Sequence, residues 1–204
     1  MACWSAENAT NAYLRTMRMG KNGKETKGAE FISALAAGNN VQLVVVACGG
    51  TADSTTLALA AAAQQTGGRI VCILPDEQKL HISQITLSTN VANVEFVVGD
   101  ANGLLSNTYK SFDFVAIDCN LENHETIITA CRNNSNAIVM GYNAFCKETW
   151  KNSDLRTQLL PIGEGLLLTR TRKIKSNWVV KVDKCTGEEH VYRVRSSVRR
   201  FIRA

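Results

Sequence analysis

The sequence predicts an α/β protein with a doubly wound, mostly parallel sheet, closed by an antiparallel hairpin and followed by an extra C-terminal hairpin. Two observations support this prediction. Short apolar, β-branched runs such as 41–47 alternate with helix-length segments, as in the β-α-β units of parallel sheets. These runs are apolar almost throughout, which indicates strands that are covered by helices on both faces.

Two helices are expected before the first strand. Residues 5–19 begin with a serine that can cap a helix, and their apolar side chains recur at helical spacing. A basic, glycine-containing loop over 20–28 leads to a second helix at 29–37, which ends at Gly38.

The first strand, 41–47, ends at the glycine turn 48–51, and Asp53 or Ser54 can cap the helix that follows. The later elements are expected in this order: helix 55–65, strand 69–74, helix 75–87, strand 94–98, strand 112–117, helix 121–131, strand 137–140, helix 144–155, antiparallel strands 158–161 and 165–172, and a hairpin of 178–182 with 190–194.

Length and composition indicate one globular domain over residues 1–204. The chain has 204 residues, of which 45% are hydrophobic and 20% charged, enough for a sizeable core. We expect this core at about 29–172, with a basic C-terminal extension at 173–204. The formal charge of +5 arises largely in that extension. It lacks an aromatic-basic motif, so we do not expect nucleic acid as a partner.

The cysteine pattern indicates a reducing compartment. Seven cysteines are present and none forms a C-x-x-C pair, which favours reduced thiols in the cytoplasm or the nucleus. Neither a secretory signal nor an apolar run long enough to cross a bilayer occurs, so no membrane partner is expected.

Glycines and acids follow the ends of the predicted parallel strands. Ligands of open parallel sheets bind beyond these carboxyl ends, where backbone N–H groups and carboxylates can converge. Glycine lets the backbone approach a ligand, and an acid beyond the second strand is placed to hold a ribose hydroxyl. The candidate ligand-binding residues are Gly49, Gly50, Thr51, Asp53, Asp76, Asp100, Ala101 and Asp118.

Four segments carry a resemblance to a known family. These are 44–50 with the helix start 55–60, then 94–101, 112–118 and 159–168. They are similar to the first, third and fourth motifs and the closing hairpin of cation-dependent O-methyltransferases of the caffeoyl-CoA type. The likeness spans about residues 31–172.

Two further segments, Met1–Ser5 and Glu30–Gly38, resemble a plant family of Rossmann-like methyltransferase homologues. The resemblance implies a class I methyltransferase-like fold, S-adenosylmethionine as cofactor and a small-molecule substrate. A homodimer is compatible with this family.

Several positions depart from the family pattern. Ala47 replaces the acid before the first glycine, Asp53 replaces the second glycine, and Leu74 stands where the ribose-holding acid is expected. Of the family's metal ligands, only Asp118 and Asn143 remain as oxygen donors. Because Mg²⁺ binding relies on carboxylate charge, we expect no bound metal.

The resemblance leaves two functions open. The first is a methyltransferase in which Asp118 or His124 serves as the base for a hydroxyl acceptor. The second is a catalytically inactive, methyltransferase-like protein that binds a ligand or a regulatory partner. His124 is also compatible with an exposed position in the first turn of a helix. Cys48, Cys72 and Cys119 lie near the ends of three strands that are expected to be neighbours. A metal or redox cluster is the alternative, and we interpret all three as packing residues.

Overall fold

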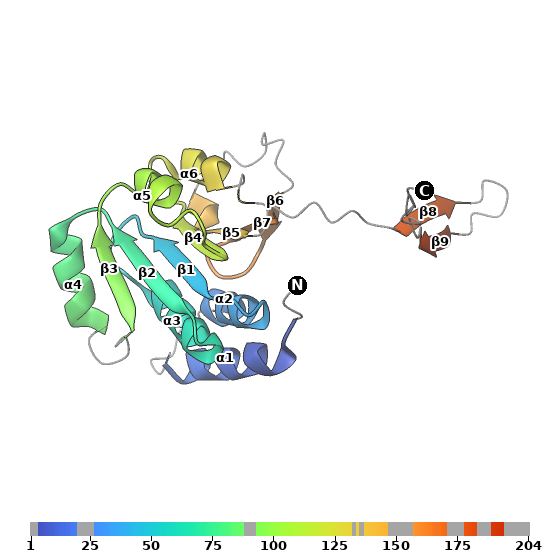
Figure 1. Cartoon of the computed structure of the whole chain (residues 1–204), viewed down its shortest axis with the longest axis horizontal. Coiled ribbons are helices and arrows are strands. Elements are labelled where there is room, and N and C mark those ends of the chain that lie inside the picture. The colour runs from blue at the N-terminus through green and yellow to red at the C-terminus, as the bar shows by residue number, and fades with distance from the viewer. Residues whose placement is uncertain are drawn as a thin grey trace, which may run out of the picture. The chain divides into compact units, whose positions relative to one another are not determined.

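The structure, a computed structural model, describes residues 4–19, 27–87, 93–131, 134, 137–146, 157–170, 178–182 and 189–193. Within these residues one sheet has the strand order β3-β2-β1-β4-β5-β7-β6 (Figure 1). Its strands are β1 (Leu43–Ala47), β2 (Arg69–Leu74), β3 (Val94–Val98), β4 (Phe114–Asp118), β5 (Ile138–Tyr142), β6 (Thr157–Leu160) and β7 (Leu166–Arg170).

Strands β1 to β5 run parallel, whereas β7 pairs antiparallel with both β5 and β6. The predicted fold class, a mostly parallel sheet closed by an antiparallel hairpin, is therefore confirmed.

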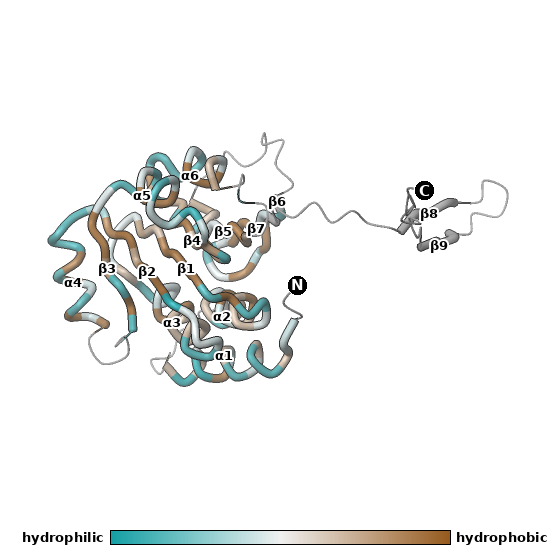
Figure 2. Tube along the Cα trace, viewed as in Figure 1, coloured by the Kyte–Doolittle hydropathy of each residue, from teal (hydrophilic) through white to brown (hydrophobic). Residues whose placement is uncertain are grey.

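Helices cover both faces of the sheet (Figure 1). They are α1 (Ala6–Met19), α2 (Lys27–Gly38), α3 (Ser54–Thr66), α4 (Glu77–Leu87), α5 (Ala101–Asn107) and α6 (His124–Cys131), with a 3₁₀ turn η1 at Ala144–Cys146. One core layer lies between the sheet and α1 to α4, and a second lies between the sheet and α5 with α6. The apolar strands thus form the centre of the molecule (Figure 2).

Strand β1 shows why its sequence is apolar throughout. Val44 and Val46 point into the first core layer, and Val45 and Ala47 point into the second. Side chains alternate between the two faces of a strand, so a strand covered on both faces has no polar position. All four residues are fully buried.

The structure differs from the expected elements at three places. Helix α5 was not expected, because its seven residues offer little periodicity. Strand β5 continues through Gly141 to Tyr142 rather than ending at the glycine. The predicted helix 144–155 is a 3₁₀ turn at its start, and 147–156 lie outside the described residues.

Contacts divide the chain into two units, Met1–Arg172 and Lys173–Ala204. In the second unit, β8 (Trp178–Val182) and β9 (Glu189–Arg193) pair as an antiparallel hairpin, as the sequence predicts. No helix in the described ranges combines the length and the apolar character needed to span a membrane.

Candidate functional site

The strand order reverses direction between β1 and β4. From β1 the chain moves outward to β2 and β3, and then returns to place β4 on the other side of β1. Such a reversal leaves a crevice beyond the carboxyl ends of the two central strands, where ligands of open α/β sheets bind. In this chain the two ends are Ala47, followed by the glycine turn, and Asp118.

Asp118 and Gly49 meet in this crevice. The Gly49 N–H donates to Asp118 Oδ2 at 3.2 Å, so the glycine turn is tied directly to the end of β4. A Cβ atom on Gly49 would lie 3.1 Å from the same oxygen and 3.2 Å from the Leu121 nitrogen. This spacing is tighter than ordinary contacts, so a side chain at position 49 would require the Asp118 carboxylate or the backbone at 120–121 to shift.

The Asp118 carboxylate receives two further hydrogen bonds at its other oxygen. Both the backbone N–H of Asn120 and the side-chain amide of Asn143 donate to Oδ1, each at 3.0 Å. The predicted metal-ligand pair, Asp118 and Asn143, is therefore joined by a hydrogen bond. In this bond the Asn143 amide nitrogen, not its oxygen, faces the Asp118 carboxylate.

Within the described ranges, no group of three or more His, Cys, Asp or Glu side chains is arranged to hold a metal ion. The absence of a metal in the functional protein stays a prediction.

A cavity of about 350 Å³ lies at the ends of β1, β2 and β3. It is lined by Cys48, Ile73, Leu74, Pro75, Gly99, Asp100, Ala101, Leu121 and Asn123. Most of these side chains are apolar, and Asp100 is the acid among them. We call this space the apolar cavity. Its lining suits a mostly apolar group that carries a polar substituent.

The two predicted ribose acids occupy different places. Asp100 lines the apolar cavity, and its carboxylate caps α5 by accepting from the Gly103 N–H at 2.8 Å. Asp76 caps α4 by accepting from the Lys79 N–H at 2.8 Å and is not part of that lining. The position aligned with the family's acid, Leu74, is fully buried in the wall of the cavity.

A second cavity, of about 130 Å³, lies near Asn143. It is lined by Gly28, Ala29, Ile32, Asp53, Ser54, Thr55, Tyr142, Asn143, Ile162, Gly163, Glu164, Gly165 and Leu166. We call this space the acidic cavity, because Asp53 and Glu164 are the ionisable carboxyl groups in its wall. The predicted glycine-turn acid Asp53 thus lies in a different cavity from Asp100.

Asp53 occupies the N-cap of α3. Its carboxylate accepts from the backbone N–H groups of Thr55 at 2.8 Å and Thr56 at 3.4 Å. Burial raises the pKa of the Asp53 carboxyl, the bonds from Thr55 and Thr56 lower it, and the nearby charge of Asp118 raises it again. The pKa of Asp53 is raised on balance. A positively charged ligand in this cavity would stabilise the ionised carboxylate.

The remaining predicted turn residues line the same edge of the sheet. A Cβ atom on Gly50 would meet no atom within 4 Å, so this glycine faces open space. Thr51 is half-buried, and Ala101 is buried in the wall of the apolar cavity.

His124 is buried, so the interpretation of it as an exposed residue in the first turn of a helix is wrong. It is the first residue of α6, only 4% exposed, and its Nδ1 lies 2.6 Å from the Leu121 carbonyl oxygen. This contact requires the proton on Nδ1, because a carbonyl only accepts. His124 belongs to the lining of neither cavity, although Leu121 lies in the wall of the apolar one.

Cys48 and Cys72 pack against each other, with their sulfur atoms 3.5 Å apart. The interaction with Cys48 and burial raise the pKa of the Cys72 thiol well above its usual range. A protonated thiol is a poor nucleophile and a poor metal ligand, which supports the packing interpretation. Cys119 is buried in a separate cluster with Ala144 and Leu167.

Ser83 of α4 is a site residue that the sequence analysis did not identify. Its hydroxyl accepts from the Ala52 N–H of the glycine turn at 2.9 Å and donates to the Lys79 carbonyl at 2.6 Å. Ser83 is fully buried, and it joins the turn to the helix that Asp76 caps. A serine within a helix carries no local signal for such a contact.

We expect Ser83→Ala to loosen the glycine turn, because the buried Ala52 N–H would lose its acceptor. The amide of Ala52 should exchange its hydrogen at least about tenfold faster, as expected for the loss of about 1.4 kcal/mol of local protection. Hydrogen exchange followed by NMR would measure this change.

Thr86→Ala is the matched control, since Thr86 makes the same bond to the carbonyl four residues earlier at 2.8 Å. It reaches no turn residue. Equal exchange of Ala52 in the two variants would contradict the role given to Ser83.

Comparisons with known proteins agree with this architecture. The sequence matches the family described as "Protein of unknown function (DUF1442)" over residues 1–194. The chain belongs to the DUF1442 family. No curated protein matches this DUF1442 chain.

Solved structures match most of the DUF1442 chain. A methyltransferase from Geobacter sulfurreducens is 23% identical, with a TM-score of 0.53 over 81% of this chain and 89% of its own. The SAH-bound methyltransferase PaMTH1 of Podospora anserina has a TM-score of 0.59 at 13% identity, over 83% and 89% of the two chains.

The O-methyltransferase TomG from Streptomyces achromogenes, in complex with SAM, has a TM-score of 0.56 at 17% identity, over 84% of this chain and 92% of its own. At these identities the likeness establishes the shared fold of the DUF1442 chain, and the function rests on the site itself.

Proposed function

We propose that the protein binds S-adenosylmethionine and transfers its methyl group to a small molecule. The observation that carries the proposal is the pair of cavities around the Gly49–Asp118 contact. The apolar cavity is lined by Leu121, whose neighbour in sequence, Asn120, donates a hydrogen bond to Asp118. The acidic cavity is lined by Asn143, which donates a second hydrogen bond to Asp118. One ligand with an apolar ring and a neighbouring cationic group fits this division.

The residues fit the two ends of the cofactor differently. In the apolar cavity, Leu74 and Ala101 offer contact to an adenine ring, and Asp100 offers a carboxylate to a ribose hydroxyl. In the acidic cavity, Asp53 offers its charge to the sulfonium group of the molecule. Bound S-adenosylmethionine supplies a methyl group on a positively charged sulfur atom.

The chain's own contribution is mainly to hold the reacting groups in line, which accounts for much of the rate in a displacement reaction. A carboxylate has about four acceptor positions, and the described residues occupy three of those of Asp118. The fourth remains for the hydroxyl of a methyl acceptor. We therefore favour Asp118 over His124 as the general base, because the Asp118 carboxylate is bonded to the glycine turn through Gly49.

The alternative is a protein that binds the cofactor without turning it over. It is favoured by Leu74, whose buried apolar side chain leaves the wall of the cavity without the family's ribose-holding acid. The resemblance of Met1–Ser5 and Glu30–Gly38 to plant homologues supports a plant origin, and reduced cysteines support a cytoplasmic or nuclear location.

Calorimetric titration of the full chain with S-adenosylmethionine and S-adenosylhomocysteine tests the proposal. We expect both to bind in the micromolar range, because two family acids are absent. No binding at saturating ligand would overturn the proposed function. Binding without methyl transfer to any of a panel of phenols, amines and thiols would select the non-catalytic alternative.

We expect Asp53→Asn to weaken binding of S-adenosylmethionine by about tenfold and of S-adenosylhomocysteine by less. Only the former carries the sulfonium charge, which attracts a carboxylate electrostatically, and a tenfold loss of affinity corresponds to about 1.4 kcal/mol. Asparagine caps helices as well as aspartate, so α3 should keep its start.

Glu164→Gln serves as the control for this effect. Glu164 lines the same cavity but is exposed, so water screens its charge. The Glu164→Gln variant should lose less than about threefold in affinity for S-adenosylmethionine. If Asp53→Asn lowered the affinities for S-adenosylmethionine and S-adenosylhomocysteine equally, the placement of the sulfonium group at Asp53 would be contradicted.

A further inference from the structure

Helix α1 packs on the fold through small residues and exposes its large ones. Its buried positions are Ala9, Ala12 and Thr16, which contact the neighbouring helices through short side chains. Its large apolar side chains lie on the outside, where Tyr13 is 42%, Leu14 43% and Met17 52% exposed. This arrangement reverses the usual distribution of apolar residues in a surface helix.

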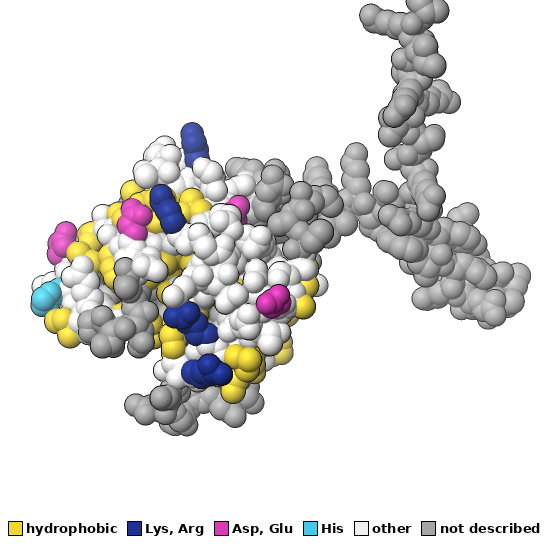
Figure 3. Space-filling model, turned by 60° about the horizontal axis from the view of Figure 1, so that its bottom comes forward, with side chains coloured by type: hydrophobic (Ala, Val, Ile, Leu, Met, Phe, Trp, Pro, Cys, Tyr) yellow, Lys and Arg dark blue, Asp and Glu magenta, His cyan; other side chains and the backbone are white. Residues whose placement is uncertain are grey.

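The inner face of α1 is complete without these large side chains. The Thr16 hydroxyl donates to the Ala12 carbonyl at 2.9 Å, so the buried polar atom is satisfied. Three adjacent large apolar side chains on one short helix form a patch of the kind that marks an interaction surface. Hydrophobic and basic side chains lie beside one another on this face of the molecule (Figure 3).

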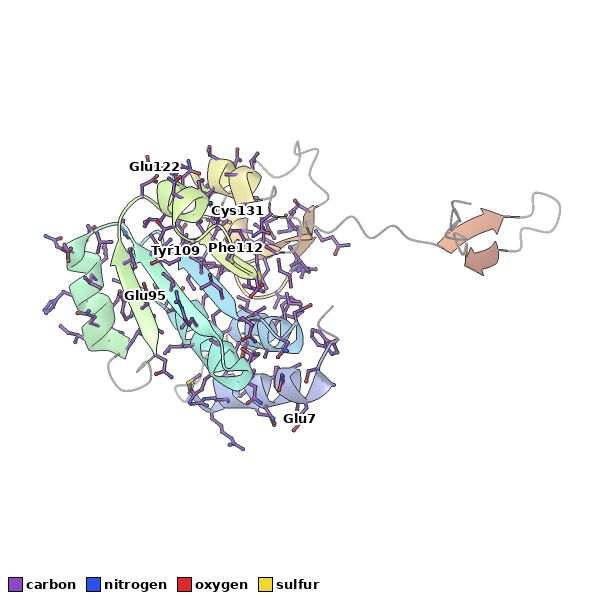
Figure 4. All side chains as sticks on the ribbon, viewed as in Figure 1. Glu7, Glu95, Tyr109, Phe112, Glu122 and Cys131 are labelled. Carbon is purple, nitrogen blue, oxygen red and sulfur yellow. The ribbon has the colours of Figure 1, made fainter. Side chains whose placement is uncertain are left out.

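Charged residues flank the patch in a self-complementary order. Glu7 lies in the first turn of α1, at its outer edge (Figure 4), and Arg18 lies in the last turn. At about 100° and 1.5 Å per residue, the two are about 20° apart around the helix and about 16 Å apart along it. They therefore lie on one stripe, with the acid at one end and the base at the other.

We propose that two copies of the chain associate through their α1 helices, packed antiparallel with Tyr13, Leu14 and Met17 at the centre. A two-fold axis between antiparallel helices brings Glu7 of each copy beside Arg18 of the other. A parallel pair would instead place like charges together and align the helix dipoles unfavourably. The charge order thus selects a second copy as the occupant of the patch, independently of the proposed function.

Sedimentation velocity of the full chain over a dilution series tests this interface. We expect a dimer that dissociates on dilution, and a monomer for Leu14→Asp. The control is Ile85→Asp on α4, since Ile85 is 63% exposed and lies outside the patch. This variant should remain dimeric. Circular dichroism and melting temperature would verify that each variant is folded.

Charge reversal separates pairing of two copies from nonspecific hydrophobic association. Glu7→Arg should raise the dimer dissociation constant by about tenfold, because Arg18 of the second copy then meets a like charge. The double variant Glu7→Arg, Arg18→Glu should restore the dissociation constant of the wild-type dimer. A monomeric wild type at every concentration, a double variant as weak as the single one, or an Ile85→Asp that dissociates like Leu14→Asp would each overturn the proposal.

Discussion

Asp118→Ala is expected to abolish detectable binding of S-adenosylhomocysteine and to lower the free energy of unfolding by about 3 kcal/mol. Three donors, from Gly49, Asn120 and Asn143, would lose their acceptor at the centre of the cleft. Each partly buried group left without a partner costs about 1–3 kcal/mol, less where water replaces the carboxylate. Urea denaturation and calorimetry would measure the two effects.

Asp113→Ala is the matched control for Asp118→Ala. Asp113 precedes the opposite end of β4, and its Oδ2 accepts from the N–H groups of Gln42 at 2.9 Å and Leu43 at 3.0 Å. Its loss should destabilise the protein by about 2 kcal/mol while leaving cofactor affinity within about twofold. If both variants lost affinity in proportion to stability, Asp118 would be a structural residue and the cleft would lie elsewhere.

Asp100→Asn is expected to weaken binding of S-adenosylhomocysteine by about tenfold with little change in stability. Asparagine preserves the N-cap of α5, whereas the charged acceptor for a ribose hydroxyl is lost. The measurement is the dissociation constant from calorimetry, with melting temperature as the check on folding.

Asp76→Asn provides the comparison, because Asp76 likewise caps a helix but stands outside the lining of the apolar cavity. Its effect on affinity should stay below about threefold. A larger loss of affinity in Asp76→Asn than in Asp100→Asn would assign the ribose to Asp76. Of the two acids, Asp76 lies closer in sequence to the position of the family's ribose-holding acid.

The parallel strands could be predicted because their signal is local. A strand buried on both faces needs a run of four or five consecutive apolar residues, and β1, β2 and β4 have such runs. The glycine and acid at each strand end then place Gly49, Asp100 and Asp118 at one edge of the sheet. This joint placement required only the parallel order of the strands.

Features that depend on neighbours from distant parts of the chain could not be predicted. The burial of His124 depends on how α6 packs, and the contact of Ser83 with Ala52 joins segments 31 residues apart. Likewise, the separation of Asp53 from Asp100 into two cavities appears only when the strand ends are in place.

The sequence by itself determined the class of fold, the direction of the sheet and the set of residues at its carboxyl edge. The tertiary structure decided how those residues are used. It showed that Asp118 accepts hydrogen bonds from Gly49, Asn120 and Asn143, and that α1 exposes its large apolar side chains. The physical reason is the distance along the chain over which each effect acts. Alternation and turn residues act over a few positions, whereas hydrogen-bond saturation and burial depend on which distant segments the fold brings into contact.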